Sequence, residues 1–170
     1  GPQLGYSYPT LLAEVEVHLH HDNDRSSSLR RSLLDFAATL SSRHGLLARD
    51  PSGRIAYGFI HGNWSLDNSL PDGRLCGVND ELTVLRETGC YADFTLPAAP
   101  SAAQTRIVNR LYYAVDNPAA PRSHDTGIRV AVERTPPPDG LLIVQGPLRV
   151  TRSRPRSGVV PPLVNGSLLA

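Results

Sequence analysis

The stretch Glu-Val-Glu-Val-His-Leu-His-His-Asp-Asn-Asp, residues 14–24, decides the predicted fold. In its first half Val15, Val17 and Leu19 alternate with acidic and imidazole side chains. This period of two predicts a strand with one apolar face. The second half is polar and predicts a loop that leads into a helix cap. Three of the chain's six histidines therefore collect at the carboxyl end of one predicted strand.

Imidazole and carboxylate groups at this strand end predict a metal site. In α/β folds the carboxyl ends of the strands form the edge where ligands and catalytic groups gather. Histidine and aspartate together suit a divalent ion, and zinc fits this donor set best. The predicted ligands are His18, His20, His21 and Asp22. The alternative is a solvated edge strand followed by a polar loop.

Length, charge and cysteine content narrow the class of protein. The 170 residues suffice for one domain that buries roughly 70% of its unfolded surface. The net charge of +1 and the scattered arginines argue against nucleic acid as a partner. No apolar run approaches the roughly 18 residues of a membrane span, so no membrane association is expected. Cys76 and Cys90 are expected to be free thiols in a cytoplasmic protein.

Helical and extended patterns alternate along the rest of the chain. A helix is predicted over 27–43 with Gly45 as its stop, and a second helix between Asn79 and Gly89. The remaining predicted elements are strands over 4–8, 55–60, 90–95, 111–115, 127–133 and 141–144, and a short helix over 101–109. This rhythm predicts an α/β fold with a parallel sheet. Residues 152–170 are basic and rich in proline and glycine, and no element is predicted there.

Three predicted strand ends carry polar clusters, at 18–22, 61–64 and 93–95. Their order resembles the polysaccharide deacetylase (NodB-homology) superfamily, whose fold is a distorted (β/α) barrel. His18-Leu19-His20-His21-Asp22 matches that family's His-[Ser/Thr]-x-x-[His/Asn/Asp] motif except at Leu19. The match implies that His18 and Asp22 are metal ligands. The stretch 77–97 is similar to a set of uncharacterised bacterial proteins with this barrel, and the matches together cover most of 14–146.

The same resemblance implies roles for two residues after the second strand. His61-Gly62-Asn63-Trp64 aligns with the family's Arg-x-Pro-aromatic motif, with His for Arg and Asn for Pro. Trp64 would then donate its backbone N–H to an oxyanion, and His61 would orient a base or bind substrate. From the residues alone, Trp64 is equally a core plug or a sugar-stacking platform. His61 is equally a histidine hydrogen-bonded at a strand end.

Two further candidates lie at later positions. Asp93 ends the third predicted strand and is the third candidate catalytic residue, with a solvated aspartate as the alternative. His124 and Asp125 form a candidate acid/base pair in a later loop, with a turn capped by Asp125 as the alternative.

The resemblance implies a metal-dependent hydrolase of acylated carbohydrate or of a small acylated substrate. Two family motifs have no equivalent here: the Asp-Asp strand end expected before residue 14, and a last motif expected beyond 170. The resemblance therefore implies a parallel (β/α) barrel-like fold over residues 1–151 that is incomplete at both ends, with weak or no turnover by itself. One alternative is a non-catalytic remnant of the barrel that binds a glycan or a partner. Another is a different metal-dependent amidohydrolase or phosphoesterase. No Gly-x-Gly-x-x-Gly, Walker loop or Gly-x-Ser-x-Gly elbow is present, which argues against a nucleotide cofactor and serine hydrolysis.

Overall fold

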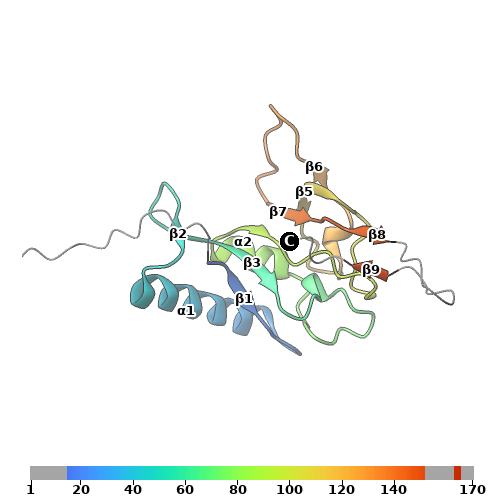
Figure 1. The fold of residues 1–170 in the computed structure, drawn as a ribbon. Coiled ribbons are helices and arrows are strands. Elements are labelled where there is room, and N and C mark those ends of the chain that lie inside the picture. The colour runs from blue at the N-terminus through green and yellow to red at the C-terminus, as the bar shows by residue number, and fades with distance from the viewer. Residues whose placement is uncertain (1–14, 152–162, 166–170) are drawn as a thin grey trace, which may run out of the picture.

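The main feature of the fold is one open, mixed sheet (Figure 1). The computed structural model describes residues 15–151 and 163–165. Seven strands follow the order β1-β3-β4-β7-β5-β6, with β2 paired to β3. The parallel part consists of β1 (Val17–Leu19), β3 (Ile55–His61), β4 (Cys90–Asp93) and β7 (Gly140–Gln145). The strands that pair antiparallel are β2 (Ala48–Arg49), β5 (Arg110–Val115) and β6 (Ile128–Arg129). The predicted α/β class is confirmed, and within the described residues the sheet does not close.

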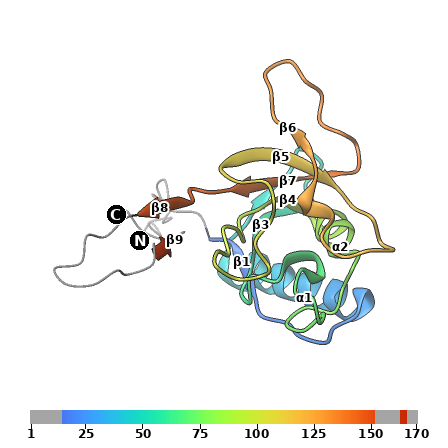
Figure 2. The same ribbon diagram turned by 90° about the vertical axis from the view of Figure 1, so that its right-hand side faces the viewer.

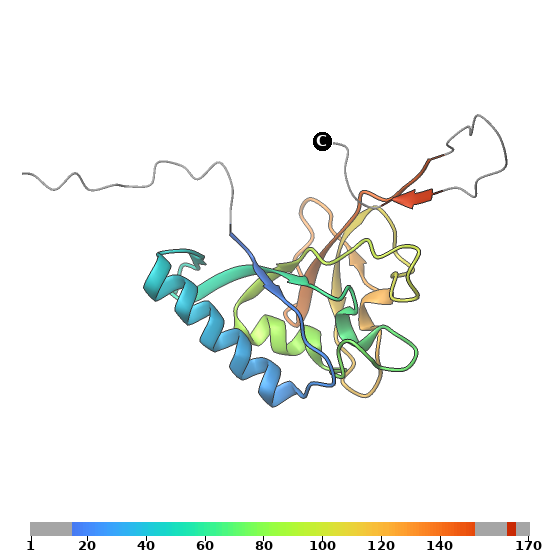
Figure 3. The ribbon, with the colours of Figure 1, turned by 60° about the horizontal axis from the view of Figure 1, so that its bottom comes forward.

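Two helices cover the same face of this sheet (Figure 3). The longer helix, α1 (Ser26–His44), buries Leu29, Leu33 and Ala37, whose spacing of four places them on one side. It ends at Gly45, whose φ of 65° is readily adopted by glycine, so the helix predicted over 27–43 is confirmed.

The shorter helix, α2 (Glu81–Thr88), packs against the centre of the sheet. It begins two residues after the predicted cap Asn79, and Gly89 ends it with φ 110°. The Tyr57 hydroxyl of β3 lies 2.6 Å from the Thr88 hydroxyl of α2, which links strand to helix inside the core.

The opposite face of the sheet is not covered by either helix. Parallel sheets usually bury both faces. Here Glu16 and His18 of the first strand segment, and Ile60 of β3, point to this second face. Histidine side chains near β1 therefore have room to reach solvent.

The segment 101–109 is not helical, and the predicted short helix there is wrong. Isolated turns occupy it instead: the Ser101 N–H donates to the Ala98 carbonyl oxygen at 2.9 Å, and the Gln104 N–H donates to the Ser101 carbonyl oxygen at 3.1 Å. The Gln104 Oε1 atom accepts hydrogen bonds from the N–H groups of Ala98 and Ala99, and the Ser101 hydroxyl accepts one from Ala103. Such local bonds offer the backbone an alternative to helix.

The boundaries of the other elements differ less from the prediction. The strand predicted over 127–133 is reduced to β6, and the strand at 111–115 is confirmed but pairs antiparallel with β7. Two short 3-10 helices, η1 (Leu66–Asn68) and η2 (Ser123–Asp125), occupy the loops beside α2. Leu66 and Leu70 are buried, so the loop between β3 and α2 contributes to the core.

A separate two-stranded sheet follows the main one. It pairs β8 (Arg149–Thr151) with β9 (Leu163–Asn165), and Figure 2 shows it projecting from the main sheet. Residues 163–165 are the described part of the segment predicted to lack structure; the rest of 152–170 and the strand predicted over 4–8 lie outside the described residues. Neither of the described α-helices is long and apolar enough to cross a membrane.

Candidate metal centre

Four side chains with zinc-type donors converge at the carboxyl edge of the parallel strands. His21 follows β1, His61 ends β3, Cys76 lies in the loop before α2, and Glu81 opens α2. One ligand atom of each lies within 4.8 Å of all the others. The parallel register pairs Leu19 with His61, which brings the two histidines to the same edge. Nitrogen, sulfur and carboxylate donors are the ligands that zinc takes in proteins.

The carboxylate of Glu81 lies at the middle of this group, which we call the four-donor cluster. Its Oε1 atom is 3.1 Å from His21 Nε2 and 3.9 Å from His61 Nε2. Its Oε2 atom is 3.4 Å from the Cys76 sulfur and accepts a hydrogen bond of 2.6 Å from the Asp67 N–H. The Glu81 side chain is fully buried, so these neighbours replace all its water.

An unpartnered nitrogen shows that the cluster fits an ion. His61 is fully buried, yet its Nε2 atom has no hydrogen-bond partner. Its Nδ1 atom accepts a hydrogen bond of 3.2 Å from the Asn63 N–H, so in the metal-free protein Nε2 carries the ring proton. An ion at Nε2 displaces that proton. The donor set therefore could hold a metal ion, and binding is expected to release protons.

Burial and the Glu81 charge set the protonation of the two histidines. Burial lowers the pKa of His61 to about 4, against the pull of Glu81. Burial also acts to lower the pKa of His21, but the hydrogen bond and charge of Glu81 outweigh it and hold that pKa above its ordinary value. Burial opposes ionisation of Glu81, and the neighbouring imidazoles of His61 and His21 nevertheless keep its pKa low. Glu81 and His21 thus form a carboxylate–imidazolium pair.

Cys76 and Cys90 are both free and buried, as predicted. Burial, followed by the negative charge of Glu81, raises the pKa of the Cys76 thiol far above its usual range. The thiol is therefore protonated in the metal-free protein. Cys90 lies outside the four-donor cluster.

Of the four predicted ligands, the structure brings only His21 into the cluster. His18 and His20 are exposed and lie together, with 3.1 Å between their Nε2 atoms. The Asp22 Oδ1 atom accepts a hydrogen bond of 2.5 Å from the Leu75 N–H, so this carboxylate ties down a loop. His61, predicted as a catalytic residue, joins His21 in the cluster, with ring centroids 4.4 Å apart.

Trp64 and Asp93, the other predicted catalytic residues, lie in contrasting environments. Trp64 is 57% exposed, which excludes a core plug, and its φ is 58°. Its N–H donates to the His61 carbonyl oxygen at 2.9 Å, so in this structure the proposed oxyanion donor is engaged in a turn. Asp93 is fully buried, which excludes the solvated alternative. Burial raises its pKa to about 7.

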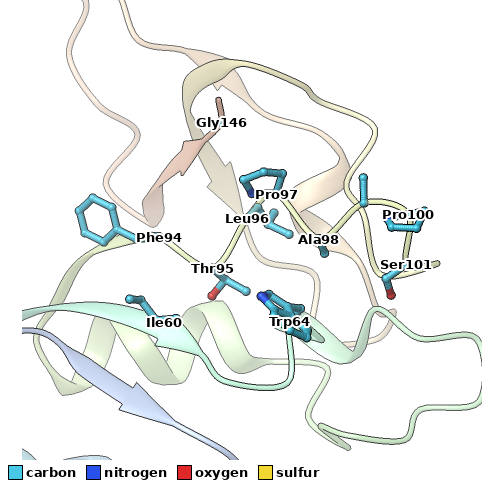
Figure 4. A pocket seen from close by; sticks show the side chains of 11 residues that line it. Ile60, Trp64, Phe94, Thr95, Leu96, Pro97, Ala98, Pro100, Ser101 and Gly146 are labelled. Carbon is cyan, nitrogen blue, oxygen red and sulfur yellow. The ribbon is translucent and has the colours of Figure 1, made fainter. Parts of the chain in front are cut away.

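A pocket of about 600 Å³ opens beside the ends of β3 and β4 (Figure 4). Trp64 and Ile60 lie opposite Leu96, Pro97 and Ala98 in this view. Thr95 lines the pocket and connects it to the buried groups. Its hydroxyl accepts a hydrogen bond of 2.8 Å from the His61 N–H and donates one of 2.6 Å to Asp93 Oδ2.

His124 and Asp125 do not form a pair. Asp125 accepts hydrogen bonds from the Arg122 guanidinium, whereas the His124 ring faces Asp67, with 4.0 Å between Nδ1 and Oδ2. Both ring nitrogens of His124 are buried and unpartnered. Burial lowers the pKa of His124 to about 4 and, with the charge of Asp116, raises that of Asp67 to about 8.

Cys76 and Glu81 were not predicted as ligands. Glu81 had the pattern of an acid in the first turn of a helix, where the dipole alone explains it. Cys76 stands far from the other cysteine and from any histidine in sequence, so no ligand spacing marked it. None of the family models, curated proteins and solved structures compared with this chain matches it.

Proposed function

We propose that this protein is a metal-dependent hydrolase of acylated carbohydrate that holds one zinc ion in the four-donor cluster. The observation that carries the proposal is the buried, unpartnered His61 Nε2 atom among three other zinc-type donors. The carboxyl edge of parallel strands, where the cluster lies, is the usual place for ligands in open α/β sheets. As part of the same proposal, we infer that the chain is a distant relative of the polysaccharide deacetylase superfamily and that its sheet corresponds to part of that family's barrel.

The chain's own residues supply binding and proton transfer. A divalent ion polarises a carbonyl oxygen and makes water more acidic. Asp93, with a pKa of about 7, is suited to taking up or releasing a proton near neutral pH, and the Thr95 hydroxyl links it to the pocket. The exposed Trp64 indole offers the pocket an apolar ring face with a polar edge, which suits a sugar.

One observation favours a second candidate, a non-catalytic protein that binds a glycan. The side chains of His61 and Glu81 are fully buried, and that of His21 is only 7% exposed. A closed set of four protein ligands is typical of structural zinc, whereas catalytic zinc keeps an open position. In this alternative the ion stabilises the loops around the pocket, and the pocket binds without turnover.

The test combines metal content with turnover. The purified chain is stripped with a chelator, reloaded with zinc or cobalt, and assayed on acetylated glucosamine oligomers and on a chromogenic acetyl ester. We expect one ion per chain, a thiolate-to-cobalt absorption band, and weak turnover that Cys76→Ser and Glu81→Gln abolish. Cys90→Ser is the matched control, because Cys90 is a buried thiol outside the cluster.

The remaining outcomes decide between the candidates. One bound ion without turnover, but with binding of the oligomer, favours the glycan-binding alternative. Turnover of a phosphate ester in place of the acetyl ester would indicate a phosphoesterase. A folded wild-type chain that takes up no ion contradicts both metal-dependent proposals.

A further inference from the structure

We propose that His18 and His20 form a second ion site, exposed and separate from the four-donor cluster, that takes a divalent transition-metal ion. The two rings stack with their centroids 5.0 Å apart, and their Nε2 atoms share a hydrogen bond of 3.1 Å, whose proton an ion would replace. When two nitrogens bind the same ion at about 2.0–2.1 Å, they lie about 2.9–3.4 Å apart, provided that the nitrogen–metal–nitrogen angle is between a right angle and the tetrahedral angle. The observed separation lies in that range. This proposal does not depend on the proposed hydrolase.

The His20 ring is held in the orientation that a ligand needs. The Asn63 Nδ2 atom donates a hydrogen bond of 2.9 Å to the His21 carbonyl oxygen, which identifies the other amide atom, Oδ1, as the acceptor. This Oδ1 atom lies 2.8 Å from His20 Nδ1. The Nδ1 atom of His20 therefore carries the proton, and Nε2 presents a lone pair. Metal-ligating histidines are commonly oriented by such a bond at the other ring nitrogen.

The backbone at Gly62 leaves space for the same ring. A Cβ atom at this position would collide with the Cδ2, Nε2 and Cε1 atoms of His20. Gly62 also donates its N–H to the Leu19 carbonyl oxygen at 2.8 Å, which fixes its distance from β1. Its φ lies outside the left-handed region, so an alanine is compatible with this backbone and would displace only the imidazole.

The pair is open to solvent, unlike the four-donor cluster. Both side chains are exposed, and they supply two donors, so an ion here has positions left for water or for another ligand. His18 pairs with Ile60 in the parallel register, and paired residues of parallel strands point to the same face. Ile60 lines the pocket beside β3, so the two-histidine site lies next to the pocket wall.

Nickel titration of the whole chain, stripped of metal with a chelator, tests the site by calorimetry. We expect the wild type to show one additional binding event, which His18→Ala or His20→Ala abolishes. Gly62→Ala should weaken it by about 10-fold or more, because the displaced ring loses its orientation. His44→Ala is the matched control, since His44 is also exposed but stands at the far end of α1, and the event should persist.

Two further measurements distinguish failure of the two-histidine site from failure of the four-donor cluster. Cys76→Ser should remove the thiolate-to-cobalt band and leave the nickel event unchanged. Long-range proton–nitrogen NMR of the metal-free chain should show His20 protonated at Nδ1. The proposal is overturned if the wild type shows no additional event, if the event survives both histidine substitutions, or if His20 is protonated at Nε2 instead.

Discussion

His21 Nε2 lies 3.1 Å from Glu81 Oε1, although 60 positions separate the two residues along the chain. The pair joins the loop after β1 to the first turn of α2. The second oxygen of the same carboxylate accepts the N–H of Asp67 in η1. One buried carboxylate thus ties three distant segments together. The candidate metal centre is therefore also a structural joint, and its loss should affect both ion binding and stability.

Glu81→Ala is expected to lower the free energy of unfolding by about 3–5 kcal/mol, because it removes the buried carboxylate that pairs with His21 and accepts the Asp67 N–H. Urea denaturation measures this loss. Glu87→Ala is the control: Glu87 pairs with Arg30 on the surface, and such pairs contribute about 0–1 kcal/mol. Equal effects of the two substitutions would contradict the central role of Glu81.

Zinc is expected to raise the midpoint of thermal unfolding, and a chelator should reverse the rise. At a free zinc concentration 1,000 times the Kd, binding to the folded state contributes about 4 kcal/mol. Scanning calorimetry of the wild type and of Cys76→Ser measures the effect, which the variant should lose. A shift that Cys90→Ser abolishes, but Cys76→Ser does not, would place the ion elsewhere.

His124 is expected to make the fold sensitive to acid. Its pKa is about 4 in the folded chain and about 6.5 in the unfolded chain, so below the higher value the unfolded state binds the extra proton. The stabilisation is fully present above about pH 6.5 and is lost as the pH falls toward 4, by at most roughly 3 kcal/mol. Unfolding of wild type and His124→Phe between about pH 7.5 and 4.5 measures the difference.

His44→Ala, which replaces an exposed histidine, is the control for the pH dependence of unfolding. His44→Ala should keep the wild-type pH dependence, whereas His124→Phe should reduce it and leave the part that comes from His61, whose pKa is also about 4. If both variants follow the wild-type curve, the buried imidazole of His124 does not govern acid stability.

Trp64→Gly is expected to separate binding from stability. Trp64 has φ 58° and is 57% exposed, so glycine relieves a left-handed backbone and removes little buried surface. The free energy of unfolding should stay within about 1 kcal/mol of wild type, while affinity for acetylated glucosamine oligomers falls. Calorimetric titration with the oligomer measures this. Trp64→Phe, which keeps an aromatic face, should still bind the oligomer. If Trp64→Gly binds it with full affinity, Trp64 does not contact the bound sugar.

Several elements could be predicted because their pattern is local. The helix α1 and its end at Gly45 were predicted from the spacing of Leu29, Leu33, Phe36, Ala37 and Leu40, of which Phe36 is 40% exposed in the structure. The helix predicted over 101–109 was wrong: the segment forms isolated turns, and the Gln104 side chain binds the N–H groups of Ala98 and Ala99 just before it. Helical periodicity does not report such competition.

The local pattern suffices to predict that histidines gather at the end of β1 and that His18 and His20 share one side of it, because side chains alternate along a strand. Which side is buried, and which donors meet, depends instead on how distant segments pack. His61 comes to His21 through the parallel register of β1 and β3, while Cys76 and Glu81 arrive through the loop packed before α2. Such proximity depends on long-range packing, and the spacing of residues along the chain carries no signal of it.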